Sequence, residues 1–260
     1  MDAPNILVIN PNSSRSMTDA LDQLIHDIDR HGTTTATATT SIVVHTYTAP
    51  SGPPSINNDA DALESANVCL RDLEPRLPQY SAYLVACYSV HPLVSMLRAK
   101  VATGVHVTSI FEASISVSLS LLPQDPKQAP SKFGIVSTGE YWEKALSDGV
   151  KEFLGLDDVK NSMRFKGVVT TGLNANDLHT APPELVKKMM VEATKRLVRD
   201  RDVKVICLGC AGMAGLDAIV DEALRGELGE DAKYVYVLDG VKAGIGLLKG
   251  LLYALPGTRL

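Results

Sequence analysis

Two short cysteine-containing stretches are candidates for chemistry: CLGCAGM at 207–213 and ACYSVHP at 86–92. The Cys-x-x-Cys spacing of the first suits a redox pair, half of a zinc site, or one working thiol beside a buried one. A zinc site needs two more ligands at metal spacing, and the sequence has neither a second Cys-x-x-Cys nor a paired histidine motif. A redox pair needs both cysteines at a helix N-terminus, whereas Cys207 falls inside an apolar strand pattern. The sequence therefore favours one working thiol, Cys210.

Cys87 and Cys210 occupy similar places in the sequence. Each follows a small residue at the end of an apolar strand pattern and precedes an amphipathic helix pattern. Backbone N–H groups and the helix dipole at such a turn lower the pKa of a thiol, so we predict that both cysteines can act as bases. Cys69 and Cys207 fall on apolar faces and are predicted to be buried packing residues.

Two equivalent thiols suit a particular kind of acid–base chemistry. A nucleophilic cysteine enzyme needs one thiol and a histidine base. A racemase needs a base on one face of a carbon and an acid on the other, and two cysteines can exchange these roles. His91, four residues after Cys87, is either a second acid–base group or a polar residue before Pro92.

The elements that must position these residues alternate along the chain. Short apolar runs typical of buried strands are followed by segments with helical periodicity, which predicts right-handed βαβ units and parallel sheets. The predicted fold class is α/β, with two pseudo-symmetric lobes of doubly wound, flavodoxin-like architecture. The strands are predicted at 6–10, 41–47, 82–87, 105–110, 132–138, 165–171, 203–209 and 233–239.

A proline-rich polar segment at 123–130 is predicted to be a linker between the lobes. We expect residues 1–122 together with 229–260 to form the first lobe and residues 123–228 to form the second. The strand-end thiols of both lobes place the expected active site between them, because open parallel sheets bind ligands at the carboxyl ends of their strands.

Composition and charge limit the possible functions. The 260 residues carry a net charge of −5 and no basic run, which argues against nucleic acid as a partner. The apolar runs are too short to span a membrane, and the N-terminus does not resemble a signal peptide. Four cysteines in such a chain favour a reducing compartment, so we expect the protein to be cytoplasmic. We also expect it to bind a small-molecule substrate and to form a homo-oligomer. The C-terminal Thr258-Arg259-Leu260 is weakly similar to a peroxisomal address.

Four motifs carry a resemblance to a known family: INPNSSRSMT at 9–18, APSGPPSI at 49–56, AC at 86–87 and LGCAGM at 208–213. With these motifs the sequence resembles the hydantoin/allantoin racemase branch of the aspartate/glutamate racemase superfamily. The resemblance implies a racemase that needs no cofactor, with Cys87 and Cys210 as its two catalytic thiols. No metal is expected either, because the sequence has no ligands at metal spacing. Members of this branch commonly have a CFGDPG-like stretch where this chain has CYSVHP, which leaves the substrate open.

Further residues are expected to bind the substrate. Polar side chains end the first strand of each half, backbone N–H groups after the two cysteines can stabilise an enolate, and two apolar residues near the APSGPPSI segment can cover the ligand. These predicted substrate-binding residues are Asn10, Tyr47, Ile56, Ser89, Ser137, Thr138, Ala211 and Gly212. For Thr138, the alternative is turn and cap chemistry.

We therefore expect an isomerase that racemises or epimerises a cyclic ureide of the hydantoin or allantoin type. Two alternatives remain open: a related isomerase or decarboxylase that acts on a small carbonyl or diacid substrate, and a non-catalytic homologue that binds a small molecule. The glycines near Cys210 lack dinucleotide-binding spacing, and no lysine has the context of a pyridoxal phosphate site.

Overall fold

The computed structural model describes residues 3–32, 42–123, 131–158 and 162–255 of the chain. Most of the predicted linker, the C-terminal Thr258-Arg259-Leu260 and the first residue of the predicted strand at 41–47 lie outside these ranges. Over the described residues, no helix is long and apolar enough to cross a membrane. The chain divides into two compact units, Met1–Ala113 with Val241–Leu260, and Ser114–Gly240.

The first unit contains a four-stranded parallel sheet of order β2-β1-β3-β4. Its two central strands, β1 and β3, are apolar runs whose side chains are largely buried on both faces, as expected when helices cover both sides of a parallel sheet, whereas the edge strand β2 is partly exposed. Its elements, with η denoting a 3₁₀-helix, are β1 (Asn5–Asn10), α1 (Arg15–Gly32), β2 (Val43–Thr48), α2 (Asp59–Leu73), η1 (Glu74–Gln79), β3 (Ala82–Val85), α3 (Pro92–Arg98), β4 (His106–Ser109) and α9 (Gly240–Ala254).

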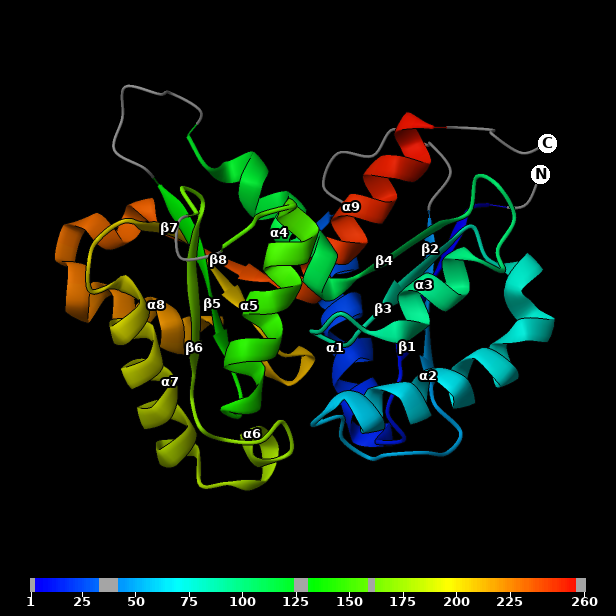
Figure 1. Ribbon diagram of the computed structural model, residues 1–260, viewed down its shortest axis with the longest axis horizontal. Coiled ribbons are helices and arrows are strands. Elements are labelled where there is room, and N and C mark those ends of the chain that lie inside the picture. The colour runs from blue at the N-terminus through cyan, green and yellow to red at the C-terminus, as the bar shows by residue number, and fades with distance from the viewer. Residues whose placement is uncertain (1–2, 33–41, 124–130, 159–161, 256–260) are drawn as a thin grey trace. The chain divides into compact units, whose positions relative to one another are not determined.

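The second unit repeats this strand order as β6-β5-β7-β8, again all parallel. Its elements are α4 (Ile110–Leu121), β5 (Lys132–Ser137), α5 (Tyr141–Leu154), β6 (Phe165–Thr170), α6 (Asp177–Thr180), α7 (Pro183–Val198), β7 (Val203–Leu208), η3 (Ala211–Met213), α8 (Asp217–Leu228), η4 (Gly229–Tyr234) and β8 (Tyr236–Asp239). In Figure 1, α7 and α8 lie side by side next to this sheet. The predicted α/β class with two lobes of parallel sheet is confirmed.

Two helices, α4 and α9, each follow the last strand of one unit and pack in the other. Helix α4 continues directly from β4, and it packs in the second unit, where Ser118 Oγ lies 3.1 Å from Cys207 Sγ of β7. Helix α9 continues from β8 and packs in the first unit, where a Cβ on Gly244 would lie 2.5 Å from Leu84 Cδ1 of β3. A side chain at 244 would therefore displace either the Leu84 side chain or the helix.

The unit boundaries differ from the expected ones. The segment 229–260 was expected to lie wholly in the first lobe, but β8 pairs with β7, so the chain rejoins the first unit only at Val241. The second unit likewise begins at Ser114, within α4 and before the expected linker. The reason is local, because both crossovers are made by helices that start directly at a strand end and not by loops. The last strand also starts later than expected, since η4 takes up residues through Tyr234.

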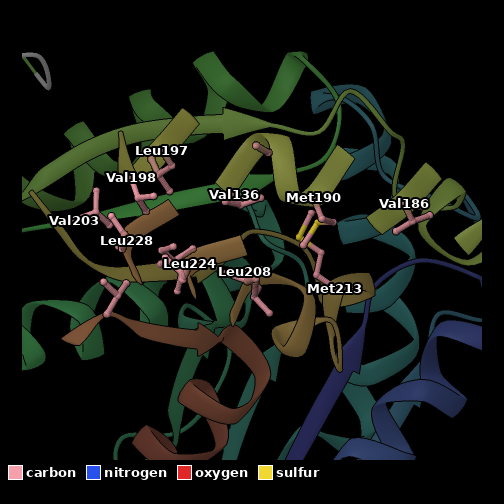
Figure 2. Packing of buried hydrophobic residues seen from close by; sticks show 14 of the residues in the cluster. Val136, Val186, Met190, Leu197, Val198, Val203, Leu208, Met213, Leu224 and Leu228 are labelled. Carbon is pink, nitrogen blue, oxygen red and sulfur yellow. The ribbon is translucent and has the colours of Figure 1, made fainter. Parts of the chain in front are cut away.

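The core of the second unit lies between its sheet and the pair α7 and α8. Val136 and Leu208 from the sheet meet Met190 and Leu197 of α7 and Leu224 of α8, all at most 2% exposed. Figure 2 shows these side chains and Met213, which lies beside Met190 and is fully buried. In the first unit, α2 and α3 cover the corresponding face of the sheet, with Ile9, Tyr83 and Leu93 buried between them.

Candidate active site

The two candidate thiols occupy the same backbone position in the two units. Cys87 follows β3, the third strand of its unit in chain order, and Cys210 follows β7, the third strand of the other. The residue before each thiol is bound to the neighbouring central strand in the same way. Ala86 N–H donates to Ile9 O at 2.8 Å, and Gly209 N–H donates to Val136 O at 2.7 Å. Each thiol therefore starts its loop at the carboxyl edge of a parallel sheet, where ligands bind in open α/β sheets.

A second pair of hydrogen bonds extends this repeat to the ends of the central strands. Ala49 N–H donates to Asn10 O at 3.1 Å, and Thr171 N–H donates to Ser137 O at 2.9 Å. Asn10 and Ser137 are therefore equivalent positions, as the sequence analysis expected from their places at the ends of two strands. The local correspondence of the two halves includes hydrogen-bonded backbone and does not depend on sequence spacing alone.

Cys210 forms the N-cap of the short helix η3. Its Sγ accepts a hydrogen bond from Gly212 N–H at 3.3 Å. Burial raises the pKa of the Cys210 thiol to about 11, against the lowering effect of the Gly212 and Met213 N–H groups. The prediction of a lowered pKa is therefore wrong for this thiol, because desolvation of the thiolate outweighs the backbone donors. At neutral pH Cys210 is a protonated thiol, the form that can give a proton to a substrate.

The LGCAGM motif positions Cys210 from both sides. A Cβ on Gly209 would lie 2.8 Å from Val136 O and 2.7 Å from Ile135 Cγ2, so only glycine allows this close approach to β5. On the other side Met213 is fully buried in the core between β7 and α7 (Figure 2). A close backbone approach before the thiol and an apolar anchor after it fix the turn.

Cys87 lies in a loop with different partners. Its half-buried Sγ lies 3.3 Å from Ser89 Oγ, and either atom can be the donor. The partner two residues after the thiol is thus a side-chain hydroxyl here and a backbone N–H beside Cys210. A hydroxyl both donates and accepts, so it can hydrogen-bond to the thiol and to the thiolate. Ser89 and Gly212 therefore contact the sulfur atoms directly, a role that the sequence analysis did not assign to them.

His91 is a buried helix cap. Its Nδ1 accepts from Leu93 N–H at 3.2 Å at the start of α3, and its Nε2 lies 3.2 Å from Ser65 Oγ of α2. Burial lowers the pKa of His91 to about 4, so the ring is neutral at pH 7. Since Nδ1 accepts, the neutral ring carries its proton on Nε2 and donates to Ser65. Of the two alternatives for His91, the structure favours the structural one, which ties the loop after Cys87 to α2.

Several predicted substrate-binding side chains form hydrogen bonds within their own unit. Asn10 donates its two amide hydrogens to Ser14 O and Thr18 Oγ1, both at 3.0 Å, and its Oδ1 accepts from Asn12 N–H. Ser137 Oγ donates to Gly209 O at 2.9 Å. Each side chain holds a loop at the carboxyl edge of its own sheet, and both are at most 2% exposed.

The remaining predicted positions divide into core and edge. Tyr47 and Ile56 are buried, and the Tyr47 ring packs in the core of the first unit with the Arg76 guanidinium 5.5 Å from its centroid. Thr138 directly follows β5, where its carbonyl accepts from Gly172 N–H at 3.0 Å. Ala211 follows Cys210 in η3. Tyr47 and Ile56 are thus buried side chains, and their predicted role as an apolar cover for the ligand stays a prediction.

The other two cysteines are buried, as expected. Cys69 donates to Pro11 O at 3.7 Å behind the β1–α1 loop, and burial raises its pKa to about 12. Cys207 packs against Ser118 of α4. Cys207 is thus the buried neighbour in the Cys-x-x-Cys stretch, and Cys210 is the thiol at the edge.

Sequence reasoning missed one acidic residue at the same edge. Asp239 is the last residue of β8 and is 6% exposed. It pairs in register with Leu208 of β7, and Leu208 lies two residues before Cys210. The only signal of Asp239 in the sequence is an acid that directly follows an apolar strand. Ser65 was missed for a different reason, because its contact with His91 joins two helices.

Two other kinds of site can be compared with the thiols. Across the described parts of the chain, no three His, Cys, Asp or Glu side chains are grouped so that they could hold a metal ion. A pocket of about 450 Å³ lies between α8 and η4, lined by side chains that include Asp221, Arg225 and Lys233. That pocket contains neither edge thiol. Cys87 and Cys210, one in each unit, therefore remain the two candidate catalytic residues.

The fold and the repeated thiol positions define a two-lobed α/β protein in which each lobe has one thiol at the carboxyl edge of its sheet. A sequence model of the family described as Asp/Glu/Hydantoin racemase matches residues 6–248. The chain therefore belongs to the Asp/Glu/hydantoin racemase family, a family of isomerases. This confirms the family resemblance and the enzyme class expected from the sequence.

Individual proteins are also similar to this chain in sequence or in fold. An uncharacterised protein of Schizosaccharomyces pombe is 32% identical over 247 residues, which cover 95% of this chain and 91% of the relative. The hydantoin racemase of Pseudomonas sp. strain NS671 is 27% identical over 92% of this chain and 82% of its own. The crystal structure of allantoin racemase from Pseudomonas fluorescens has a TM-score of 0.72 at 23% identity, covering 96% of this chain and 91% of that one. The last similarity concerns the fold.

Proposed function

We propose that the protein racemises or epimerises a cyclic ureide of the hydantoin or allantoin type, without a cofactor, through Cys87 and Cys210. The observation that carries this proposal is the equivalent placement of the two thiols at the third strand of each unit, with matching hydrogen bonds from Ala86 and Gly209. Two equivalent acid–base groups suit a reaction whose forward and reverse steps are mirror images.

In the proposed mechanism one thiolate removes the hydrogen from the ring stereocentre, and the other thiol returns a proton to the opposite face. Cys210, a protonated thiol at neutral pH, is the proton donor for the enantiomer whose hydrogen faces Cys87. The negative charge moves to the ring carbonyl as the enolate forms. Since Gly212 N–H already donates to Cys210 Sγ, the N–H groups of Ala211 and Ser89 are the proposed donors to this enolate.

The charges near the thiols support a ring substrate over a free amino acid. The segments 86–91 and 209–213 contain no lysine or arginine that could hold a side-chain carboxylate. Arg98, farther along α3, is bound to Glu112 and to Val107 O. The hydrogen of a hydantoin stereocentre lies beside an amide carbonyl, whereas that of an amino acid lies beside a carboxylate, where ionisation adds charge to charge. The hydantoin racemase among the relatives supports the same substrate class.

Polarimetry on a panel of substrates tests this function. Allantoin, 5-benzylhydantoin, aspartate and glutamate are each offered as single enantiomers to the purified protein. We expect at least one ring substrate to lose its optical rotation faster than both amino acids. Faster turnover of aspartate or glutamate than of every ring substrate would contradict the proposed substrate class. Activity that disappears with a chelator and returns with zinc would contradict the metal-free mechanism.

A further inference from the structure

The residue before Cys210 is held at both its backbone groups by two consecutive residues of β5. Gly209 N–H donates to Val136 O at 2.7 Å, and Gly209 O accepts from Ser137 Oγ at 2.9 Å. Ser137 is 1% exposed, so its hydroxyl is shielded from water. The carbonyl that it binds belongs to the peptide unit that also contains Cys210 N. Because a peptide unit is planar, a hydrogen bond to this oxygen also fixes the orientation of the Cys210 backbone N–H and therefore the direction of the chain at Cys210.

The equivalent residue of the first unit cannot make this contact. Asn10 occupies the position of Ser137, but both hydrogens of its amide are donated to Ser14 O and Thr18 Oγ1 in its own loop. Neither hydrogen is available for Ala86 O, the counterpart of Gly209 O. The backbone hydrogen bond of the residue before the thiol is therefore present in both units. The hydrogen bond from a central-strand side chain to the carbonyl of that residue is made by Ser137 in the second unit and not by Asn10 in the first.

We propose that Ser137 is a positioning residue for Cys210, acting through the carbonyl of Gly209, and not a substrate contact. A serine has one hydroxyl hydrogen, and Ser137 has given it to Gly209 O, so contact with a ligand through that hydrogen would break the bond. The catalytic consequence rests on the proposed racemase function: weakening the bond impairs proton transfer at Cys210 and leaves Cys87 in place.

The first test measures thiol accessibility and needs no substrate. Ser137→Ala and the parent protein are treated with iodoacetamide at one pH, and alkylation of Cys210 and Cys87 is followed by peptide mass spectrometry. Cys87 is an internal reference in the same molecule. One net hydrogen bond is worth about a two- to tenfold change in an equilibrium, so we expect the Cys210-to-Cys87 rate ratio to change by about that factor.

Ser147→Ala is the matched control. Ser147 is a half-buried residue of α5 whose hydroxyl donates to Glu143 O, and it has no place in the proposed site. We expect this variant to keep the parent alkylation ratio. Thermal melting identifies the folded samples that are compared. An unchanged ratio in folded Ser137→Ala overturns the positioning role.

The second test measures which thiol is affected. Each enantiomer of a ring substrate is incubated in deuterium oxide, with loss of the ring hydrogen followed by NMR and inversion followed by polarimetry. If Cys210 is misplaced, the carbanion made by Cys87 is reprotonated on the same face more often. The exchange-to-inversion ratio then rises for one enantiomer, the same one for which it rises in Cys210→Ser.

The outcomes separate this inference from the proposed function. A parent protein that racemises no ring substrate contradicts the function, while the alkylation ratio still decides the role of Ser137. An equal rise of the exchange-to-inversion ratio for both enantiomers overturns the assignment of Ser137 to Cys210, because general damage to the site acts on both faces.

Discussion

Gly209→Ala is the substitution whose effect can be worked out most directly from the structure. The new Cβ would lie 2.7 Å from Ile135 Cγ2, 2.8 Å from Val136 O and 3.0 Å from Ser137 Cβ. The Val136 oxygen belongs to the backbone of the central strand and cannot rotate away, so β7 must move from β5. Overpacking of this kind costs about 1–3 kcal/mol, and weakening the 2.7 Å bond from Gly209 N–H adds about 1 kcal/mol. We expect the free energy of unfolding to fall by about 2–4 kcal/mol.

Urea denaturation measures this loss, with Gly226→Ala as the control. Gly226 lies in helix α8, and a Cβ there would have no atom within 4 Å. Alanine is the better helix former, so this variant should gain up to about 1 kcal/mol. Gly209→Ala should also lose most of its activity, because the displaced segment carries Cys210. A Gly209→Ala protein as stable as the parent would refute the close-packing argument.

Two more predictions concern buried residues. Burial lowers the pKa of His91 from 6.5 to about 4, so between these pH values the unfolded chain binds a proton that the folded protein does not. The stability that the neutral ring contributes is therefore complete above about pH 6.5 and is lost as the pH falls toward 4. The whole loss is about 3 kcal/mol. Urea denaturation at pH 7 and 4.5 should thus show a smaller loss in His91→Asn, which keeps a capping acceptor, than in the parent; equal losses would contradict this account. Cys207→Ala should lose about 1–3 kcal/mol of stability, since the side chain is fully buried, and retain activity per folded molecule. A folded but inactive Cys207→Ala protein would reverse the roles given to the two cysteines of CLGCAGM.

The features that follow from local pattern could be predicted from the sequence. Apolar runs alternating with helical periodicity predict parallel sheets, and a cysteine just after such a run lies at the sheet edge. The burial of Cys207 and Cys69 follows from the same patterns. The start of β8 was predicted too early, because the whole of KYVYVLD has the composition of a strand. In the structure its first two residues, Lys233 and Tyr234, belong to the 3₁₀-helix η4.

Contacts between distant residues could not be predicted in this way. The bond from Ser137 to Gly209 O spans 72 positions and that between Ser65 and His91 spans 26, and no sequence pattern pairs them. The same holds for the pKa of Cys210. The turn and its N–H donors can be read from LGCAGM, but the burial that outweighs them depends on tertiary packing.

The most direct test of the central claim is hydrogen exchange in deuterium oxide by Cys87→Ser and Cys210→Ser. Removing a general acid–base group lowers a rate by about 10²- to 10⁴-fold, so racemisation of the ring substrate should fall by that factor in both variants. Each variant should still exchange the ring hydrogen of one enantiomer, and the two variants should prefer opposite enantiomers. Full racemase activity in either variant would contradict the two-thiol mechanism.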